Sequence, residues 1–560
     1  MKIKRDSKTV GIIVAVILLI LTLVRIVMGV KIPLLLQGDA KYDDFMMVEY
    51  AESILSGKWL GDFSFKAMIK TAAFPMLLAL GYRLGFSYAT LLTILYVLAV
   101  ALLSFVMGKL IGNKIFAALF YIFMLFSPVM LHEENVQKIY RGGYIVVFAI
   151  FIIASVIGLF SFYKNSTAIL AAFSALLSVS LPIFWYLKED SIWIMPFVIC
   201  GLGCSILRCI ISKKEIGQVY LRIICYVIPL LVMALSITAY RGVNKSVYGV
   251  YADTDRSGTY FQKVIEDILQ IEGASNGETW VTQEALHSAT LESDTLRKMA
   301  YDLDMVSYGR LEEDGEVHGD FIIWTFREAG ESHGLYTSAS DIEAYWEQVH
   351  AELMKAYEDG RLKRSTDKLY LSSVAVGYTW DELKEYYLGR LSEVARTVIT
   401  YDHNGLTTKE ASGTPEQIER MHRLVKGGYI SKDISEDNLE SYERVVRSAN
   451  RINRLYSLTG KAVFVAASVG MLLLLARFII EIRRKETSDM GWILLISIGM
   501  ALTAILVIVA VMWFCNFLTI WKIYDYSCGA VIIMEITEAV GVYYLVDSVI
   551  SLIKKKMGNK

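Results

Sequence analysis

Ten long apolar runs constrain the fold of this 560-residue sequence more than any other feature. A helix needs about 20 apolar residues to cross the hydrocarbon core of a bilayer, and each run has roughly that length. Lipid offers the backbone no hydrogen bonds, so such runs cross the membrane as helices. We therefore predict an all-α polytopic membrane protein. The predicted spans lie near residues 10–30, 87–108, 115–131, 144–163, 167–187, 191–211, 218–240, 460–480, 490–513 and 529–552.

The composition supports this class and argues against one kind of partner. Hydrophobic residues make up 55% of the chain and the mean hydropathy is +0.44, as is typical of polytopic membrane proteins. Residues 241–458 hold 25 Lys and Arg against 38 Asp and Glu, whereas the remainder holds 31 against 19. An acidic soluble block on a basic membrane part argues against nucleic acid, which requires clustered positive charge.

Basic residues in the short connections predict the orientation of the spans. The N-terminus carries Lys2, Lys4, Arg5 and Lys8, and positively charged segments usually stay on the cytoplasmic side. With that end inside, every other connection on the same side also carries at least one Lys. We therefore predict a multi-pass protein of the plasma membrane with both termini in the cytoplasm. The outer segments would be 31–86, 132–143, 188–190, 241–459 and 514–528.

The same pattern divides the chain into three parts. Residues 1–240 would form a seven-span membrane domain with an acidic first outer loop, and residues 460–560 a three-span segment. Between them, 241–459 would be a mainly helical extracytoplasmic domain inserted between the seventh and eighth spans. Its helical periodicity is clearest at 321–330, 341–357, 380–399 and 438–458, and the last of these is expected to continue into the eighth span.

Aromatic side chains in the inserted region allow two interpretations. Packing in a helical core is the ordinary role of a Trp at helical spacing, and stacking on a sugar is the alternative. The residues concerned are Trp280, Trp324, Trp346 and Trp380.

The first outer loop is the richest in candidate catalytic groups. Asp39, Asp43 and Asp44 follow the first span directly, in the sequence QGDAKYDDF, and an amphipathic stretch begins after them. A carboxylate here can deprotonate an acceptor hydroxyl or bind a divalent cation. The alternative is that one Asp caps the helix starting near Phe45. Lys70, later in the loop, is a candidate ligand for a phosphate.

The second and third outer loops add charges at the membrane surface. In HEENVQKIYRGGY, Lys138 and Arg141 predict a phosphate clamp, with internal ion pairs as the alternative. In the very short YLKEDS connection, Glu189 and Asp190 would lie at the surface as a second acid or as acceptor-binding residues. The remaining charged residues of these loops are His132, a candidate metal ligand, the acids Glu133 and Glu134, and Lys188, a further candidate ligand for a phosphate.

Two further features near the last span leave alternatives open. Cys515 and Cys528 flank a short predicted outer loop, and they either pair or remain two free thiols. Glu535 and Glu538 lie three residues apart inside the last span, hence on one helix face. Such acids point into the bundle or a hydrated cavity, where they either contact a substrate or pair with a cation such as Arg25.

Taken in order, these motifs resemble the GT-C superfamily of polytopic glycosyltransferases, which includes aminoarabinose transferases and protein mannosyltransferases. The similarity covers roughly residues 1–240: a first span, an Asp-containing loop, an amphipathic helix ending SGKWLG, and then Lys70 and Pro75. A related pattern in the superfamily has Lys followed by prolines, whereas Lys70 is followed by Thr and Ala. The resemblance implies lipid-linked sugar donors and an essential acid in the first outer loop, which by position is Asp43 with Asp44 beside it.

The resemblance implies transfer of a sugar from a polyprenyl phosphate donor to an extracytoplasmic glycan, lipid or protein. Asp43 would be the base, with Asp39, Asp44, Glu189 and Asp190 as further candidate catalytic acids. A divalent metal ion stays open, with Asp43, Glu133 and Glu134 as candidate ligands. Two alternatives remain: a transporter or flippase for a lipid-linked glycan, and a non-catalytic receptor or assembly protein.

Overall fold

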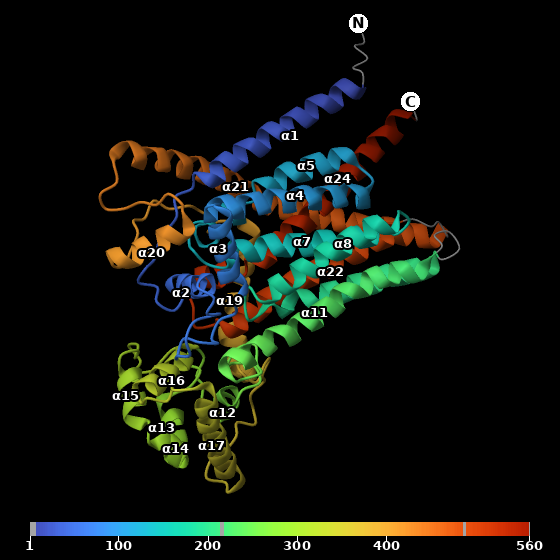
Figure 1. The fold of residues 1–560 in the computed structure, drawn as a ribbon. Coiled ribbons are helices and arrows are strands. Elements are labelled where there is room, and N and C mark those ends of the chain that lie inside the picture. Colours follow the sequence, from blue (N-terminus) through green and yellow to red (C-terminus); the bar gives the residue numbers. More distant parts are fainter. Residues whose placement is uncertain (1–6, 213–217, 485–488, 559–560) are drawn as a thin grey trace.

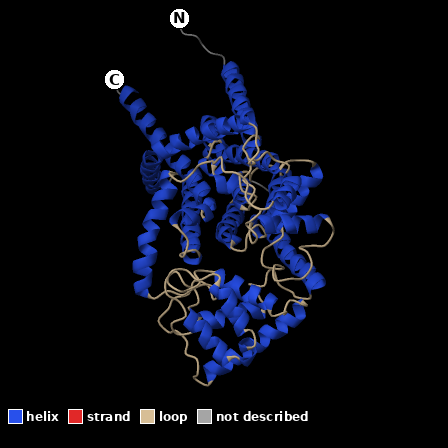
Figure 2. Ribbon diagram, turned by 90° about the vertical axis from the view of Figure 1, so that its left-hand side faces the viewer, coloured by secondary structure: helices blue, strands red, loops and turns tan. Residues whose placement is uncertain are grey.

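The computed structural model describes residues 7–212, 218–484 and 489–558, and within these ranges it contains helices and no named strand (Figure 2). Ten helical segments among them are long and apolar enough to cross a membrane, which confirms the predicted number. They are α1 (Ser7–Val30), α4 (Tyr88–Ile111), α5 (Lys114–Leu125) with η1 (Pro128–Leu131), α7 (Gly142–Ser161), α8 (Thr167–Trp185), η2 (Ser191–Ile194) with α9 (Met195–Ile211), α11 (Val219–Tyr248), α21 (Glu436–Arg484), α22 (Met490–Phe514) and α24 (Cys528–Gly558).

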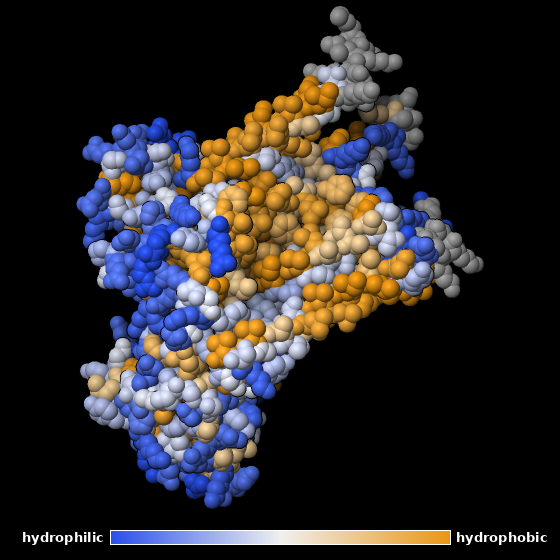
Figure 3. All heavy atoms as spheres, in the orientation of Figure 1, coloured by the Kyte–Doolittle hydropathy of each residue, from blue (hydrophilic) through white to orange (hydrophobic). Residues whose placement is uncertain are grey.

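The bundle is built around α7, whose most apolar window is 94% buried by the rest of the chain. Helices α4, α8 and α9 pack against it, and α21 lies along α24. Gly470 and Gly541 lie where α21 and α24 touch, and a Cβ on either would meet the backbone of the other helix. Small residues at such a crossing allow the close backbone approach that holds membrane helices together. The outward faces of the long helices form an apolar band in Figure 3.

The segments between the spans gather at one end of the bundle, called here the loop end, which lies to the left in Figure 1. The start of α1 and the end of α24 lie at the opposite end. The loop end is made of residues 31–87, 132–141, 186–190, 249–435 and 515–527. The candidate catalytic loops identified from the sequence therefore meet at one end of the molecule.

Two short helices of the first loop cover this end. Helix α2 (Asp44–Leu55) buries Met46, Met47 and Tyr50, the apolar face expected of the amphipathic stretch. Helix α3 (Ala73–Leu84) is apolar but too short to span a bilayer. Helix α2 packs against α3, and both contact α20 of the inserted region. The first loop is thus a packed layer over the end of the bundle.

The inserted region is shorter than the sequence boundaries suggest, because α11 continues to Tyr248 and α21 already begins at Glu436. As predicted, the last helical pattern and the eighth span form one continuous helix, α21. The other predicted helical patterns also form helices. The remaining helices are α6 (Glu133–Val136), α12 (Tyr260–Leu269), α13 (Gln283–Glu292), α14 (Asp294–Arg297), α15 (Ala300–Tyr308), α16 (Phe321–Ser332), α17 (Ala339–Glu358), α18 (Trp380–Glu382), η3 (Leu383–Leu388), α19 (Gly389–Thr400), α20 (Pro415–Val425) and α23 (Ile520–Tyr526).

The inserted region has two parts with different positions. Helices α12 to α17 form a lobe at the bottom of Figure 1, whereas α19 packs against α21, α22 and α23, and α20 packs against α2 and α3. Trp280, Trp324 and Trp346 are buried, as core packing requires, whereas Trp380 is 67% exposed. Three of the four tryptophans are therefore core residues.

Candidate functional site

A cluster of polar side chains forms at the loop end from three loops of the membrane part. Asp43 precedes α2, Lys70 precedes α3, Tyr140 and Arg141 precede α7, and Glu189 lies in the turn between α8 and η2. Lys70 Nζ lies 2.6 Å from Asp43 Oδ1, and Arg141 Nη1 lies 2.7 Å from Glu189 Oε2. The sequence interpretation placed the four charged residues in one functional region, and the structure brings them together.

Asp43 occupies the position before α2, where a capping residue would lie, but its side chain makes no capping hydrogen bond. Its Oδ1 instead accepts hydrogen bonds from Lys70 Nζ at 2.6 Å and from the Tyr140 hydroxyl at 2.9 Å. The structure therefore contradicts the capping alternative for Asp43. The side chain is 51% exposed, so the carboxylate is accessible from outside the protein.

Arg141 and Glu189 form the buried half of the cluster. Arg141 Nη1 donates to both carboxylate oxygens of Glu189, at 3.0 and 2.7 Å, and its side chain is only 4% exposed. The backbone N–H of Thr71 donates to the same carboxylate at 3.1 Å, which ties the Lys70 segment to the turn after α8. Glu189 therefore acts first as an anchor for Arg141 and for the backbone beside Lys70.

Tyr140 links the two ion pairs, and sequence reasoning missed it. Its hydroxyl donates to Asp43 and accepts from Lys70 Nζ at 2.9 Å and from Arg141 Nη2 at 2.6 Å. A tyrosine beside a membrane span is usually one of the interfacial aromatics, so its position in the sequence gave no signal. The network connects the accessible Asp43 to the buried Arg141 through a single hydroxyl group.

Both acids of the network are held in the ionised form. For Asp43, burial raises the pKa, but the charge of Lys70 and the hydrogen bonds from Lys70 and Tyr140 outweigh it and lower the pKa to about 2. For Glu189, burial also raises the pKa, and the charges of Arg141 and Lys70 lower it to about 2. The cluster therefore presents balanced opposite charges near neutral pH.

Asp44 has a different environment from Asp43, although the two are adjacent. Its residue is only 2% exposed, and Oδ2 accepts a hydrogen bond from the backbone N–H of Ile139 at 3.1 Å. Burial raises its pKa to about 7, with the charge of Lys138 opposing this and those of Asp43 and Glu134 adding to it. Asp44 thus lacks the exposure that direct contact with a substrate requires.

This environment predicts a pH-dependent contribution of Asp44 to stability. Its pKa is raised from the usual 3.8 to about 7, so between these pH values the unfolded state has lost a proton that the folded state keeps, and stability falls as pH rises from about 4 to about 7. We therefore expect the thermal midpoint of Asp44→Asn, relative to wild type, to increase between about pH 4 and about pH 7 and to stay level at higher pH. Parallel midpoint curves for the two proteins would contradict this, and Asp62→Asn, at an exposed acid of the same loop, is the control.

Lys138 and Arg141 bind different partners within the protein. Lys138 Nζ lies 2.8 Å from Glu134 Oε1, whereas Arg141 binds Glu189. Glu134 also pairs with Lys522, and Glu133 pairs with Lys409 at 3.2 Å. One ion pair within this loop, Glu134–Lys138, is therefore present, and the phosphate clamp stays a prediction.

Other candidate residues lie around the cluster with partners of their own. Asp39 accepts a hydrogen bond from Ser412 of the inserted region at 2.5 Å. Lys188 lies 2.6 Å from Asp190 and also 4.5 Å from the centre of the Tyr526 ring. Lys188 and Asp190 therefore border the cluster without bonding to Asp43.

The structure decides two of the alternatives that the sequence left open near the last span. Cys515 and Cys528 are free thiols, so of the two alternatives the structure contains the unpaired one. Arg25 donates to the backbone carbonyls of Leu125 and Met130, at 3.1 and 3.0 Å, rather than to the acids of α24.

The acids of α24 are buried and bond to neutral hydroxyl groups. Glu535 accepts from Ser127 at 2.9 Å, and Glu538 accepts from Tyr401 at 3.0 Å. In each carboxylate the second oxygen is buried without a hydrogen-bond partner among the described residues. These acids lie inside the bundle, as the sequence predicted, but they do not pair with Arg25, the cation considered as their partner.

The candidate metal ligands do not assemble around Asp43. Asp43, Glu133 and Glu134 each pair with lysines, as described above. Within residues 7–212, 218–484 and 489–558, ligating groups come close enough together for a metal ion at His132, His403 and Asp525. His403 and Asp525 gave no signal in the sequence.

The cluster combines an accessible, ionised carboxylate with two cations and a hydroxyl group. Such a group can accept a proton or a hydrogen bond from a hydroxyl, and the cations can stabilise an anion beside it. Comparison of the chain with protein-family models, with curated proteins and with solved structures finds no match in any of the three.

Proposed function

We propose that the chain is a membrane glycosyltransferase of the GT-C type that transfers a sugar from a polyprenyl phosphate donor to an extracytoplasmic glycan, lipid or protein. The observation that carries this proposal is the pairing of the accessible Asp43 with Lys70, where the loops meet the ends of the spans. A lipid-linked donor has its phosphate at this level while its tail remains in the bilayer. Acid and cation are therefore positioned to meet the acceptor hydroxyl and the donor phosphate.

The proposed reaction is an inverting displacement. The acceptor oxygen attacks the anomeric carbon, the bond from that carbon to the phosphate oxygen breaks, and the phosphate leaves with the electron pair. Asp43 takes the proton of the acceptor hydroxyl. Since the lipid phosphate is a good leaving group, positioning and charge neutralisation supply much of the acceleration.

Lys70 couples donor binding to the activation of Asp43. In the structure, Lys70 lowers the pKa of Asp43 to about 2, which makes this carboxylate a weak base. A donor phosphate that draws Lys70 away removes the strongest opposing charge, so the pKa of Asp43 rises towards the range in which it accepts a proton. The base would then become effective when the donor is bound.

Arg141, Glu189 and Tyr140 have positioning roles in this proposal. Glu189 fixes Arg141 and the backbone of Thr71, which follows Lys70 directly. Tyr140 holds Asp43 and Lys70 at a common hydroxyl. These contacts keep the acid and the cation in place before the substrate arrives.

Native mass spectrometry of protein purified from its own membranes tests donor binding. We expect a polyprenyl phosphate to co-purify with the wild type and to be lost from Lys70→Gln, because the phosphate loses its nearest cation. Lys66→Gln is the matched control, since Lys66 lies in the same loop and pairs with Glu49 at 2.9 Å. If all three proteins retain only bulk phospholipid, the proposed donor site is wrong.

One observation favours a second candidate, a transporter for a lipid-linked glycan. Acids buried within a membrane bundle are costly and usually mark a transport or proton pathway. Glu535 and Glu538 meet this description, and each has one carboxylate oxygen without a partner among the described residues. For a transporter, Glu535→Gln would abolish flux in proteoliposomes while Asp43→Asn would preserve it, and the glycosyltransferase proposal expects transfer to depend on Asp43.

A further inference from the structure

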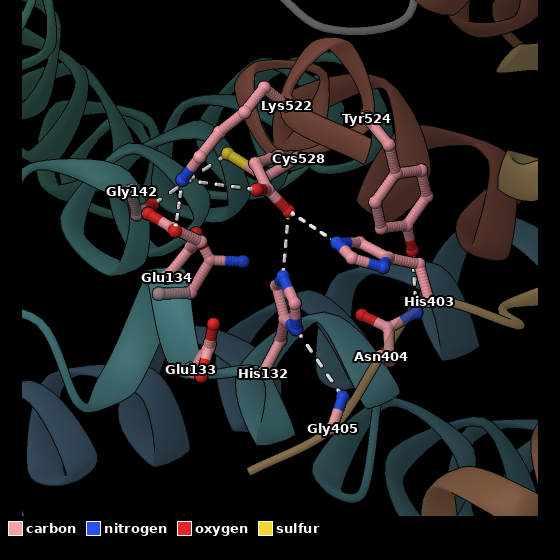
Figure 4. Close-up of polar contacts among 12 residues, drawn as sticks. His132, Glu133, Glu134, Gly142, His403, Asn404, Gly405, Lys522, Tyr524 and Cys528 are labelled. Atoms are coloured by element: carbon pink, nitrogen blue, oxygen red, sulfur yellow. Dashed lines mark hydrogen bonds and ion pairs between the residues drawn. The ribbon is translucent and has the colours of Figure 1, made fainter. Parts of the chain in front are cut away.

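A second polar cluster forms where three distant segments of the chain meet (Figure 4). His132 comes from the second loop, His403 from the segment after α19 of the inserted region, and Asp525 from α23. His132 Nε2 lies 2.7 Å and His403 Nε2 lies 3.3 Å from the same oxygen, Asp525 Oδ1. His132 and Asp525 are 393 positions apart, so only the tertiary fold brings them together.

We propose that His132, His403 and Asp525 form a binding site for a divalent transition-metal ion of the zinc type. Two imidazole nitrogens and one carboxylate oxygen are a donor set that suits zinc. The ligating atoms all lie within 4.8 Å of one another. Bonds of about 2.0–2.1 Å in tetrahedral geometry place ligand atoms about 3.3 Å apart. The His403–Asp525 pair already has this separation, and the 2.7 Å His132–Asp525 pair has to open by several tenths of an ångström.

The exposure of the ligands fits a site with one open coordination position. The side chains of His132 and Asp525 are 3% and 8% exposed, whereas that of His403 is 27% exposed. The Trp521 ring stacks on His403, with 4.6 Å between ring centres, and restricts the orientation of the imidazole. The three protein ligands are thus fixed by packing, and the exposed side at His403 admits a water molecule as the fourth ligand.

The surrounding hydrogen bonds define what the metal ion must displace. The backbone N–H of Gly405 points at His132 Nδ1 at 3.3 Å, which places the ring proton on Nε2, facing Asp525. Metal coordination at Nε2 requires the ring proton on Nδ1, so the 3.3 Å hydrogen bond from the Gly405 N–H to Nδ1 is lost. Lys522 lies 3.7 Å from Asp525 Oδ2 and also pairs with Glu134, so this cation has an alternative partner when a metal ion binds.

The site would fasten the inserted region to the membrane bundle. His403 follows α19, His132 precedes α6, and Asp525 lies in the short helix α23 before the last span. The next residue, Tyr526, lies under Lys188 at the edge of the Asp43 cluster. A bound ion would therefore fix α23 and its neighbours, and this inference does not depend on the proposed sugar transfer.

Titration of the full-length, detergent-solubilised protein without a histidine tag tests the site. After treatment with a chelator, the wild type is expected to bind one Co²⁺ with the visible absorption of a four-coordinate ion, and Zn²⁺ should displace it. Zn²⁺ should also raise the thermal midpoint, because a ligand that binds only the folded state stabilises it. Octahedral-type absorption, or an unchanged thermal midpoint, would overturn the proposal.

Variants decide whether these residues hold the ion. His403→Ala and Asp525→Asn should each weaken binding by at least about 100-fold, since loss of an outer-shell partner alone costs about 10–100-fold. His287→Ala, at an exposed histidine of the inserted region, is the control and should bind as the wild type does. His403 is the most exposed of the three ligands, so His403→Ala disturbs the packing least, and elution as a monodisperse peak checks its folding. Equal affinity of His403→Ala and His287→Ala would show adventitious binding and refute the site.

Discussion

Asp43→Asn is expected to lower the rate of sugar transfer by about 10²–10⁴-fold, the contribution typical of a general base. The amide has the shape of the carboxylate, but it cannot accept the proton of the acceptor hydroxyl. Asp43 is half-exposed and lies at the end of the network, so the substitution leaves the buried Arg141–Glu189 pair in place. Transfer should therefore fall while thermal stability and donor binding change little.

The measurement is a transfer assay in proteoliposomes, with a purified polyprenyl phosphate sugar and with membrane extract as the source of acceptor. Asp62→Asn is the matched control, because Asp62 lies in the same loop with an 88% exposed side chain and a surface partner, Lys58. The control should retain wild-type activity. Full activity of Asp43→Asn would exclude Asp43 as the base and would leave the cluster with a structural role.

The membrane fold was readily predicted because its signals are local. Length and hydropathy define each span independently of its neighbours, and all ten predicted spans correspond to apolar helices. The boundaries of the inserted region were harder to place. Helix α11 runs on to Tyr248, and α21 is continuous from Glu436, so two helices cross the points where the hydrophobic runs stop. Hydropathy identifies the part of a helix that suits lipid, not the part that extends beyond it.

The cluster was predictable only as far as charge in a membrane-facing loop is informative. Asp43, Lys70, Arg141 and Glu189 were marked by their charge and by their places between spans. Which charges pair with one another depends on how the loops fold over the bundle, and no periodicity encodes this. Lys138 illustrates the point, since it lies three residues from Arg141 in the sequence yet pairs with Glu134.

In both clusters, residues that are uncharged or isolated in the sequence were harder to predict than the charged residues of the loops. Tyr140 resembles any interfacial tyrosine in sequence, and only the structure reveals three polar partners at its hydroxyl. His132 was considered as a lone ligand, because His403 and Asp525 lie hundreds of positions away in segments without a metal-binding motif. Sites that are assembled from distant loops require the tertiary structure for their recognition.

Separating Arg141 from Glu189 is expected to destabilise the protein by about 3–5 kcal/mol, because removal of one partner leaves a buried charge uncompensated. Arg141 is 4% exposed and has Glu189 as its carboxylate partner, and its Nε is already buried without a hydrogen-bond partner in the part of the chain that the structure describes. Glu189→Leu should therefore lower the thermal midpoint strongly. Arg141→Met should also lower it, since Glu189 then keeps only the Thr71 backbone N–H as a described donor.

The double variant, Arg141→Met with Glu189→Leu, separates stability from function. Replacing both members of a buried ion pair by apolar residues of similar volume is often neutral, so the double variant should recover much of the lost thermal stability. Sugar transfer should not recover, because the backbone beside Lys70 loses its anchor at Glu189. The exposed Lys58–Asp62 pair provides the control cycle, with a coupling of about 0–1 kcal/mol. If the double variant regains activity together with stability, the pair serves only the fold and Arg141 has no part in the reaction.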